Sequence, residues 1–297
     1  MIFRIVEPSR SGSKLGTPHA SRLALYPFLQ AGRFVLPLER PLIVGVVNVT
    51  PDSFSDGGQF FDAQRAIDHA LRLIDEGADV LDVGGESSRP GATPIGAEEE
   101  LRRVLLVVER FAAGTVPVSV DTCKPEVMSR AIAAGASMIN DINALRLPGT
   151  AEAVADSQAG VCLMHMRGEP RTMQVQPEYA DVVGEIREFL GQRIEAALRS
   201  GISRQRIVAD PGFGFGKTRE HNFELLSRLR EFGRLGVPIY AGLSRKSLLK
   251  ALTGRGVEQR LPGSIALAMV ALENGARLLR VHDVAATRDA VAVFQAS

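Results

Sequence analysis

Short apolar runs bounded by turn residues alternate along the chain with longer stretches whose apolar residues recur at helical spacing. The short runs are typical of strands buried on both faces, and the long stretches are typical of helices with one buried face. The predicted strands are about residues 42–48, 79–83, 116–120, 137–140, 160–165, 206–210, 237–243 and 277–281. The predicted helices are about residues 63–76, 97–112, from 125 onward, 151–157, 186–198, 220–232, 246–252 with 263–274, and 284–294.

Eight strand–helix units in succession predict a parallel sheet with right-handed crossovers. In a chain of 297 residues, we expect the sheet to close into a (β/α)8 barrel rather than to form an open doubly wound sheet. Residues 1–27 show no clear period and are interpreted as a partly disordered N-terminal arm. Residues 28–38, with Gly32-Arg33 in the middle, predict a short strand pair that plugs one end of the barrel. Residues 28–297 contain no linker-like change of composition, so we expect one domain.

Composition excludes several classes of function. The net charge is +1, which argues against a nucleic-acid or membrane surface. Cys123 and Cys162 lack zinc spacing and are interpreted as free thiols in a reducing compartment. No run approaches the length of a membrane span, and the first residues lack a secretory signal pattern. We therefore expect a cytoplasmic protein.

Polar residues gather where the predicted strands end, which is where the active site of such a barrel lies. One group is acidic or amide and the other is basic. The first comprises Asp121, Asn140 and Asp210, and the second Arg89, Lys246, Arg280 and His282, with Lys217 and Arg245 nearby. The first group suits a flat heterocycle with several N–H donors. The second suits phosphate groups, because the last strands and a following helix N-terminus commonly bind phosphate in this fold.

Other interpretations of single residues remain open. Any one strand-end aspartate can instead cap the next helix, and we favour structural roles for Asp82 and Asp141. Glu86 and His165 fit either a structural or a binding role, and Lys217 and Arg245 fit solvated surface charges equally well. Lys246 also permits a Schiff-base role, although such a lysine normally lies within a strand. The 212–218 segment fits neither the P-loop nor the dinucleotide-binding pattern, so its glycines are expected to let backbone approach a planar ligand.

Eight segments, in order, make the chain resemble the dihydropteroate synthases, a pterin-binding barrel family. They are residues 48–58 (NVTPDSFSDGG), 82–91 (DVGGESSRPG), 119–122 (SVDT), 139–141 (IND), 163–166 (LMHM), 210–217 (DPGFGFGK), 244–247 (SRKS) and 280–284 (RVHDV). The family joins p-aminobenzoate to 6-hydroxymethyl-7,8-dihydropterin diphosphate and releases diphosphate. The chain departs from many members in having Ser88 for threonine and Arg167 for glutamine.

The resemblance implies a role for each matching residue. Asp121, Asn140, Asp210 and Lys246 would hold the pterin; Asn48, Ser88, Arg280 and His282 the diphosphate; and Arg89, Phe215, Lys246 and Ser247 the aminobenzoate. Asn48 would also bind Mg²⁺. Asp56 would act from a loop that closes over the site together with residues 89–91. Catalysis is thus expected to depend on Asp121, Asp210, Lys246, Arg280, His282 and Asp56.

We expect an SN1-like reaction, in which cleavage of the C–O bond runs ahead of attack by the neutral aniline. The family also suggests a homodimer. Two other functions fit the pterin-binding group: methyl transfer from methyltetrahydrofolate to a corrinoid, and pterin binding without turnover. The first has no use for Arg280 and His282 as a diphosphate clamp, and the second does not require Asn48, Asp56 or Lys246.

Overall fold

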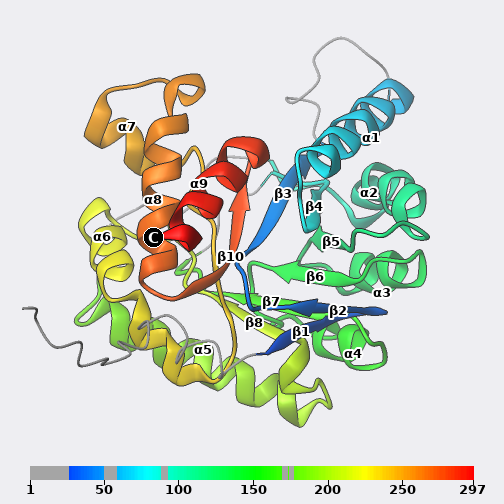
Figure 1. Ribbon diagram of the computed structural model, residues 1–297. Coiled ribbons are helices and arrows are strands. Elements are labelled where there is room, and N and C mark those ends of the chain that lie inside the picture. Colours follow the sequence, from blue (N-terminus) through cyan, green and yellow to red (C-terminus); the bar gives the residue numbers. More distant parts are fainter. Residues whose placement is uncertain (1–26, 50–58, 88–92, 169–172, 174–176) are drawn as a thin grey trace, which may run out of the picture.

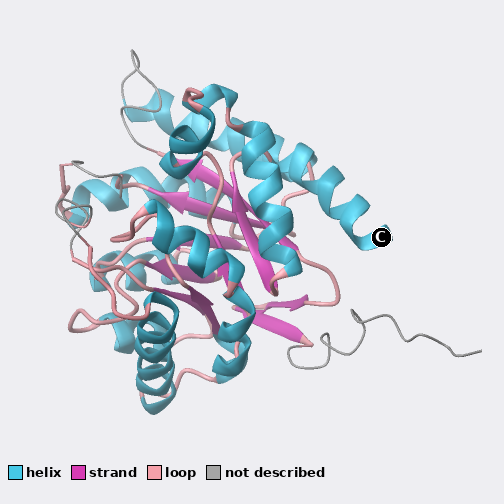
Figure 2. Cartoon of the chain, turned by 90° about the vertical axis from the view of Figure 1, so that its left-hand side faces the viewer, coloured by secondary structure: helices cyan, strands magenta, loops and turns pink. Residues whose placement is uncertain are grey.

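The computed structural model describes residues 27–49, 59–87, 93–168, 173 and 177–297. Eight parallel strands form a closed barrel in the order β10-β3-β4-β5-β6-β7-β8-β9, and helices surround it (Figures 1 and 2). The predicted (β/α)8 barrel is therefore confirmed. The barrel strands are β3 (Leu42–Asn48), β4 (Val80–Gly84), β5 (Val118–Asp121), β6 (Met138–Asp141), β7 (Gly160–Met164), β8 (Ile207–Asp210), β9 (Ile239–Ala241) and β10 (Ala276–Val281).

The helices lie close to their predicted positions. They are α1 (Gln59–Asp75), α2 (Ala97–Phe111), α3 (Pro125–Ala133), α4 (Thr150–Ala155), α5 (Val182–Arg199), α6 (Arg219–Ser227), α7 (Ser247–Thr253), α8 (Leu261–Glu273) and α9 (Val284–Ala296), with 3-10 turns η3 (Arg204–Arg206), η4 (Leu229–Leu235) and η5 (Val257–Gln259). Gly77, with φ of 94°, follows α1 and donates its N–H to Ile74 O at 2.9 Å, as expected after a helix end. No helix among the described residues is both long and apolar enough to cross a membrane.

Two predicted elements were wrong in detail. The helix expected over residues 220–232 is divided into α6 and η4, which meet at Arg228. Here Arg228 bonds to carboxylates on both sides, at Glu224 (2.7 Å) and Glu231 (2.7 Å). The strand expected over 237–243 is shortened to three residues, since Pro238 has no N–H to donate to a neighbouring strand.

The expected strand pair is present at the N-terminal end of the barrel. β1 (Phe28–Ala31) and β2 (Phe34–Pro37) form an antiparallel hairpin. Leu29, Ala31 and Leu38 are buried in the same apolar cluster as Leu42 and Leu278 from the barrel interior. The hairpin therefore closes this end of the barrel, as predicted. The arm assigned to residues 1–27 lies, apart from its last residue, outside the described part of the chain.

Side chains inside the barrel form layers of four, because alternate strands point residues inward at the same height. The strand registers give each layer. The lowest contains Val80, Met138, Val208 and Leu278. The second contains Val44, Ser119, Cys162 and Tyr240. The third contains Asp82, Asn140, Asp210 and Arg280. The interior thus changes from apolar to polar at the third layer, toward the C-terminal ends of the strands.

Candidate active site

The third layer is a ring of charged and amide side chains in the middle of the barrel. Arg280 donates through Nε to Asp82 Oδ2 at 2.6 Å and through Nη2 to Asp121 Oδ2 at 2.9 Å. Asn140 donates through Nδ2 to the same Asp82 oxygen at 3.1 Å. Asp82 is fully buried, so Arg280 supplies the countercharge that water cannot. The two carboxylates raise the pKa of Arg280 above its usual value, and it remains a cation.

Two acceptors in this ring face no donor. Asp82 Oδ1 and Asn140 Oδ1 are both buried, and neither has a hydrogen-bond partner among the described residues. An unpaired buried polar atom costs about 1–3 kcal/mol. A ligand that brings the missing donors would remove this cost. They therefore indicate where a ring with N–H groups can bind.

Asp121 lies one layer above, on β5. Burial raises its pKa to about 7; the charge of Arg280 opposes this shift, and that of Asp82 adds to it. Burial thus disfavours the ionised form of Asp121, whereas the ion pair with Arg280 favours it. Like Asn140, it lies at the carboxyl end of its strand, as the sequence predicts.

Asp210 ends β8 and starts the loop that leads to α6. Its Oδ1 accepts the N–H of Gly212 at 2.7 Å, and burial raises its pKa to about 6. Gly212 has φ of 72°, and a Cβ at this position would lie 1.9 Å from His165 O. Only glycine fits here, because the loop turns directly over the end of β7.

Lys217 holds the same loop in place through hydrogen bonds and is not a solvated charge. Its side chain is buried, and Nζ donates to Gly212 O at 2.8 Å and Phe215 O at 2.8 Å. A third contact, at 3.1 Å, joins Nζ to His165 Nδ1. Burial and Lys217 together lower the pKa of His165 to about 2, so the imidazole is neutral and structural. His165 O, at 3.4 Å, is a fourth acceptor around Lys217 Nζ, and burial lowers the pKa of Lys217 well below its usual value.

Lys246 precedes α7 and reaches back over this loop. Its Nζ lies 4.3 Å from the centre of the Phe215 ring, which is a cation–π contact. Burial lowers the pKa of Lys246 to about 8, and the charge of Asp210 opposes that shift. Arg260 Nη1 donates to Arg245 O at 2.9 Å and so fixes the backbone just before Lys246. Ser247, the first residue of α7, is exposed.

His282 follows β10 and contacts Ser244, which follows β9. The Ser244 hydroxyl lies 3.0 Å from His282 Nδ1 and accepts the backbone N–H of His282 at 3.2 Å. Burial, followed by the charges of Arg280 and Arg245, lowers the pKa of His282 to about 3. The ring is therefore neutral. Arg245, which we considered a possible surface charge, is instead paired with Asp283 at 2.6 Å.

Asn48 ends β3 beside Asp121. A Cβ on Gly84 would lie 3.8 Å from Asn48 Oδ1 and 3.7 Å from Asp121 Cβ, so the two side chains converge above this glycine. The described residues contain no cluster of three or more His, Cys, Asp or Glu suited to a metal. Mg²⁺ commonly uses one or two protein oxygens together with substrate phosphates and water. The residues present therefore fit an Mg²⁺ ion that binds with a phosphorylated substrate.

Several other expectations have mixed outcomes. Asp141 faces away from the interior and accepts the N–H groups of Asn143 at 2.8 Å and Leu145 at 2.7 Å, which agrees with the structural role we favoured. Glu86 forms an ion pair with Lys124, which also contacts the buried Glu100. Asp56, Ser88 and Arg89, together with the proposed closing loops, lie outside the described residues.

One residue of the site was missed from the sequence. The structural role that we favoured for Asp82 agrees with its contacts to Arg280 and Asn140. Ser244 was given no role of its own, although it contacts His282. The contact made by Ser244 depends on the spatial meeting of two loops and leaves no local pattern.

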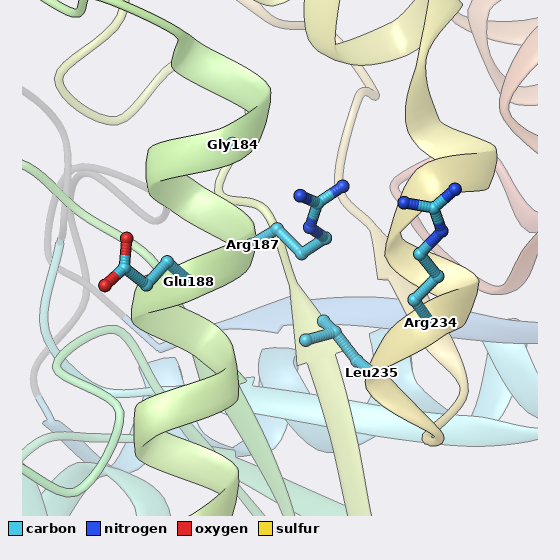
Figure 3. Close-up of a pocket in the computed structure, with 5 residues that line it drawn as sticks. All are labelled: Gly184, Arg187, Glu188, Arg234 and Leu235. Carbon is cyan, nitrogen blue, oxygen red and sulfur yellow. The ribbon is translucent and has the colours of Figure 1, made fainter.

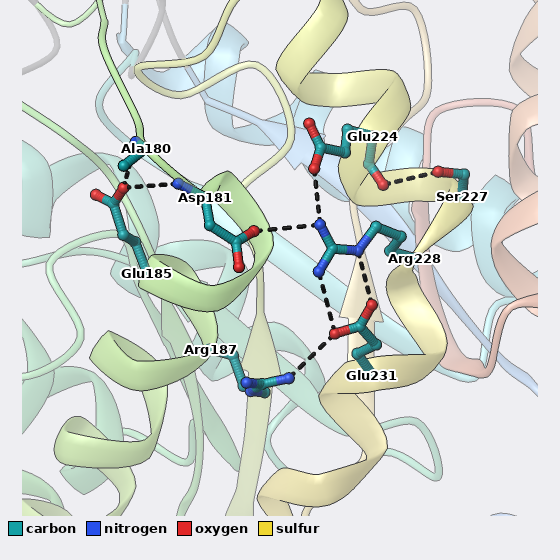
Figure 4. Close-up of polar contacts among 8 residues, drawn as sticks. All are labelled: Ala180, Asp181, Glu185, Arg187, Glu224, Ser227, Arg228 and Glu231. Atoms are coloured by element: carbon teal, nitrogen blue, oxygen red, sulfur yellow. Dashed lines mark hydrogen bonds and ion pairs between the residues drawn. The ribbon is translucent and has the colours of Figure 1, made fainter.

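A cavity on the outer helices is separate from this site. Figure 3 shows it between α5 and η4, lined by Gly184, Arg187, Glu188, Arg234 and Leu235. Arg187 pairs with Glu231 at 3.1 Å. Figure 4 shows the neighbouring network, in which Arg228 bonds to Asp181, Glu224 and Glu231. Because these charges largely compensate one another, we assign the cavity no substrate.

Comparison with known proteins agrees with the geometry. The pterin binding enzyme family matches residues 44–282. The dihydropteroate synthase of Escherichia coli (strain K12) is 47% identical over 263 residues, covering 88% of this chain and 93% of that protein. The Haemophilus influenzae dihydropteroate synthase is 46% identical over 273 residues, covering 91% and 98%.

Solved structures show the same likeness. The Xanthomonas albilineans dihydropteroate synthase with 4-aminobenzoic acid has a TM-score of 0.86 and 55% identity, covering 91% of this chain and 98% of that one. The same enzyme in complex with 7,8-dihydropteroate has a TM-score of 0.83 and 52% identity, with the same coverage. The chain belongs to the pterin-binding enzyme family and, within it, to the dihydropteroate synthases.

Proposed function

We propose that the mouth of the barrel condenses 6-hydroxymethyl-7,8-dihydropterin diphosphate with p-aminobenzoate, giving 7,8-dihydropteroate and diphosphate for folate biosynthesis. The observation that carries the proposal is the pair of unpaired buried acceptors, Asp82 Oδ1 and Asn140 Oδ1. They lie in the same layer as Asp210 and beneath Asp121. A dihydropterin edge presents N–H donors that match such acceptors.

The pterin diphosphate would span the interior and the rim. Asp121, Asn140 and Asp210 would hold the ring together with Lys246. Arg280 and His282 would face the diphosphate, in line with the phosphate site common at the last strands of this fold. Arg280 already pairs with the carboxylates of Asp82 and Asp121. It would therefore interact with the leaving group as the cation of a cluster that also contains two carboxylates.

Charge would develop in opposite directions as the C–O bond breaks. The carboxylates of Asp121 and Asp210 would stabilise positive charge spreading into the dihydropterin, while Arg280 would stabilise negative charge on the diphosphate. This arrangement favours an SN1-like reaction. No strong base is needed, because the aniline nitrogen attacks as a neutral group and loses its proton afterwards.

We further propose that Mg²⁺ binds with the diphosphate and that Asn48 Oδ1 is its protein ligand. When bound, the ion would neutralise negative charge on the departing phosphates. The aminobenzoate would lie near Phe215, Lys246 and Ser247. Arg89 is proposed for the same subsite, Ser88 for the diphosphate, and Asp56 for the closing loop, on the family resemblance alone.

We propose a homodimer formed through α8. The exposed side of this helix is apolar, with Leu261 37% and Val270 44% exposed, and Glu273 is its only charged residue. Helices that are apolar all round are normally covered, and a second copy of the chain would supply the cover. We also place the protein in the cytoplasm, in keeping with its two free thiols.

The decisive experiment measures diphosphate release from the pterin diphosphate with Mg²⁺, with and without p-aminobenzoate. Release that depends on the aminobenzoate, with dihydropteroate formed one for one, is the expected result. Tight binding of the pterin diphosphate without turnover would overturn the catalytic proposal.

A further inference from the structure

Ser244 and His282 belong to two adjacent segments that are joined at consecutive positions. Ser244 contacts both the backbone N–H and Nδ1 of His282. The next residue along, Arg245, pairs with Asp283 through bonds of 3.1 and 2.6 Å. Arg245 N also donates to Ser264 Oγ at 3.0 Å. The serine hydroxyl is thus held at a fixed place beside the imidazole.

The hydrogen bonds of Ser244 determine which ring nitrogen carries the proton. The side chain is 8% exposed, and its oxygen already accepts the N–H of His282. Its own hydrogen therefore needs an acceptor, and among the described residues the contact available to it is His282 Nδ1. A neutral imidazole has one donor and one acceptor nitrogen. If Nδ1 accepts, the proton is on Nε2.

The surroundings keep the ring neutral. The charged groups facing it come from three segments: Arg280 on the same strand, Arg245 and Lys246 after β9, and Asp283 before α9. Three cations against one carboxylate disfavour a further positive charge. A neutral ring with a fixed tautomer provides one directed donor.

We propose that Ser244 is a positioning residue that holds His282 as the Nε2–H tautomer, so that the ring donates a hydrogen bond to an oxygen of the departing diphosphate. The diphosphate ligand in this proposal rests on the proposed function, whereas the tautomer of His282 does not depend on that function. His282 acts here as a hydrogen-bond donor and transfers no proton. Its contribution is greatest when charge gathers on the leaving oxygen, so the effect falls on kcat more than on KM.

The tautomer is measured directly by NMR of the ¹⁵N-histidine-labelled full chain, with a His282→Gln spectrum for assignment. The expected signal is a protonated Nε2 and an unprotonated Nδ1 at pH 7.5. Ser244→Ala should give a mixture of tautomers and lower kcat roughly three- to tenfold, as expected for the loss of one hydrogen bond. KM for p-aminobenzoate should stay within about twofold. Ser244→Thr retains the hydroxyl, so its spectrum should again show a protonated Nε2 and an unprotonated Nδ1.

Thr150→Val is the matched control, because it removes a buried hydroxyl that bonds to Leu147 O at the start of α4 and makes no contact with Ser244 or His282. It should leave the tautomer unchanged. A wild-type ring protonated on Nδ1, or an Ser244→Ala variant with unchanged tautomer and kcat, would overturn the proposal. If the Nε2–H tautomer is found but no dihydropteroate is formed, the proposed function fails while the role of Ser244 in setting the tautomer stands.

Discussion

Replacing Asp210 with asparagine should weaken catalysis and stabilise the ligand-free protein at the same time. Asparagine has the same shape, and its Oδ1 can still accept the Gly212 N–H, which lies 2.7 Å from the aspartate oxygen. What is lost is the negative charge that faces the ligand. In its place, an amide N–H₂ would face the donors of the pterin.

The magnitudes follow from the pKa of this group. Burial raises the pKa of Asp210 from 3.8 to about 6, so the folded protein holds its proton more tightly than the unfolded chain. Stability therefore falls as pH rises from about 4 through 6. At pH 7.5 the ionised carboxylate costs on the order of 3 kcal/mol, at about 1.4 kcal/mol for each tenfold change in proton affinity. Loss of a charge-assisted bond costs catalysis about 1.5–3 kcal/mol, or roughly 10- to 150-fold in kcat/KM.

Urea unfolding at pH 7.5 and pH 4, with kinetics at pH 7.5, tests both parts. Asp210→Asn should be more stable than wild type by about 2–3 kcal/mol at pH 7.5. Near pH 4 the two proteins should differ by less than about 1 kcal/mol. The Asp141→Asn control should keep kcat/KM within about threefold per folded molecule. A variant that is destabilised at both pH values, or that retains full activity, would refute the reasoning.

Three further outcomes are expected. Activity should fall as pH rises through about 8, because burial lowers the pKa of Lys246 to about 8 and its ammonium form is lost above that pH. A rate–pH profile of Lys246→Arg should lack this alkaline decline, and an unchanged profile would assign it to another group. Arg280→Met should lower the free energy of unfolding by about 3–5 kcal/mol, because Asp82 is left as a buried charge. Adding Asp82→Leu should recover part of that loss, and no recovery would contradict the ion-pair argument. Val270→Glu should convert the proposed dimer to a monomer in analytical ultracentrifugation, whereas an unchanged dimer would place the interface elsewhere.

The barrel was predictable because its information is local. Each strand is a short apolar run, each helix has a period of its own, and eight such units at this length leave few topologies. The hairpin over residues 28–38 was predictable for the same reason. Positions at the carboxyl ends of strands then pointed to Asp121, Asn140 and Asp210.

What the sequence could not supply was the partner of each polar group. Lys217 resembles a surface charge until the four acceptors around its Nζ are seen, and Arg245 does so until Asp283 is placed beside it. No local feature of the sequence shows that Asp82 lies at the centre of the polar layer. Its importance depends on Arg280, which lies 198 positions away in the chain.

That separation has a consequence for how the protein is made. Arg280 lies on the last strand, which also completes the barrel by pairing with β3. Until this strand leaves the ribosome, the carboxylates of Asp82 and Asp121 have no guanidinium to neutralise them. Closure of the sheet and neutralisation of its interior therefore occur together. A nascent chain that lacks its final strand would have neither a sealed barrel nor a place to bind its substrate.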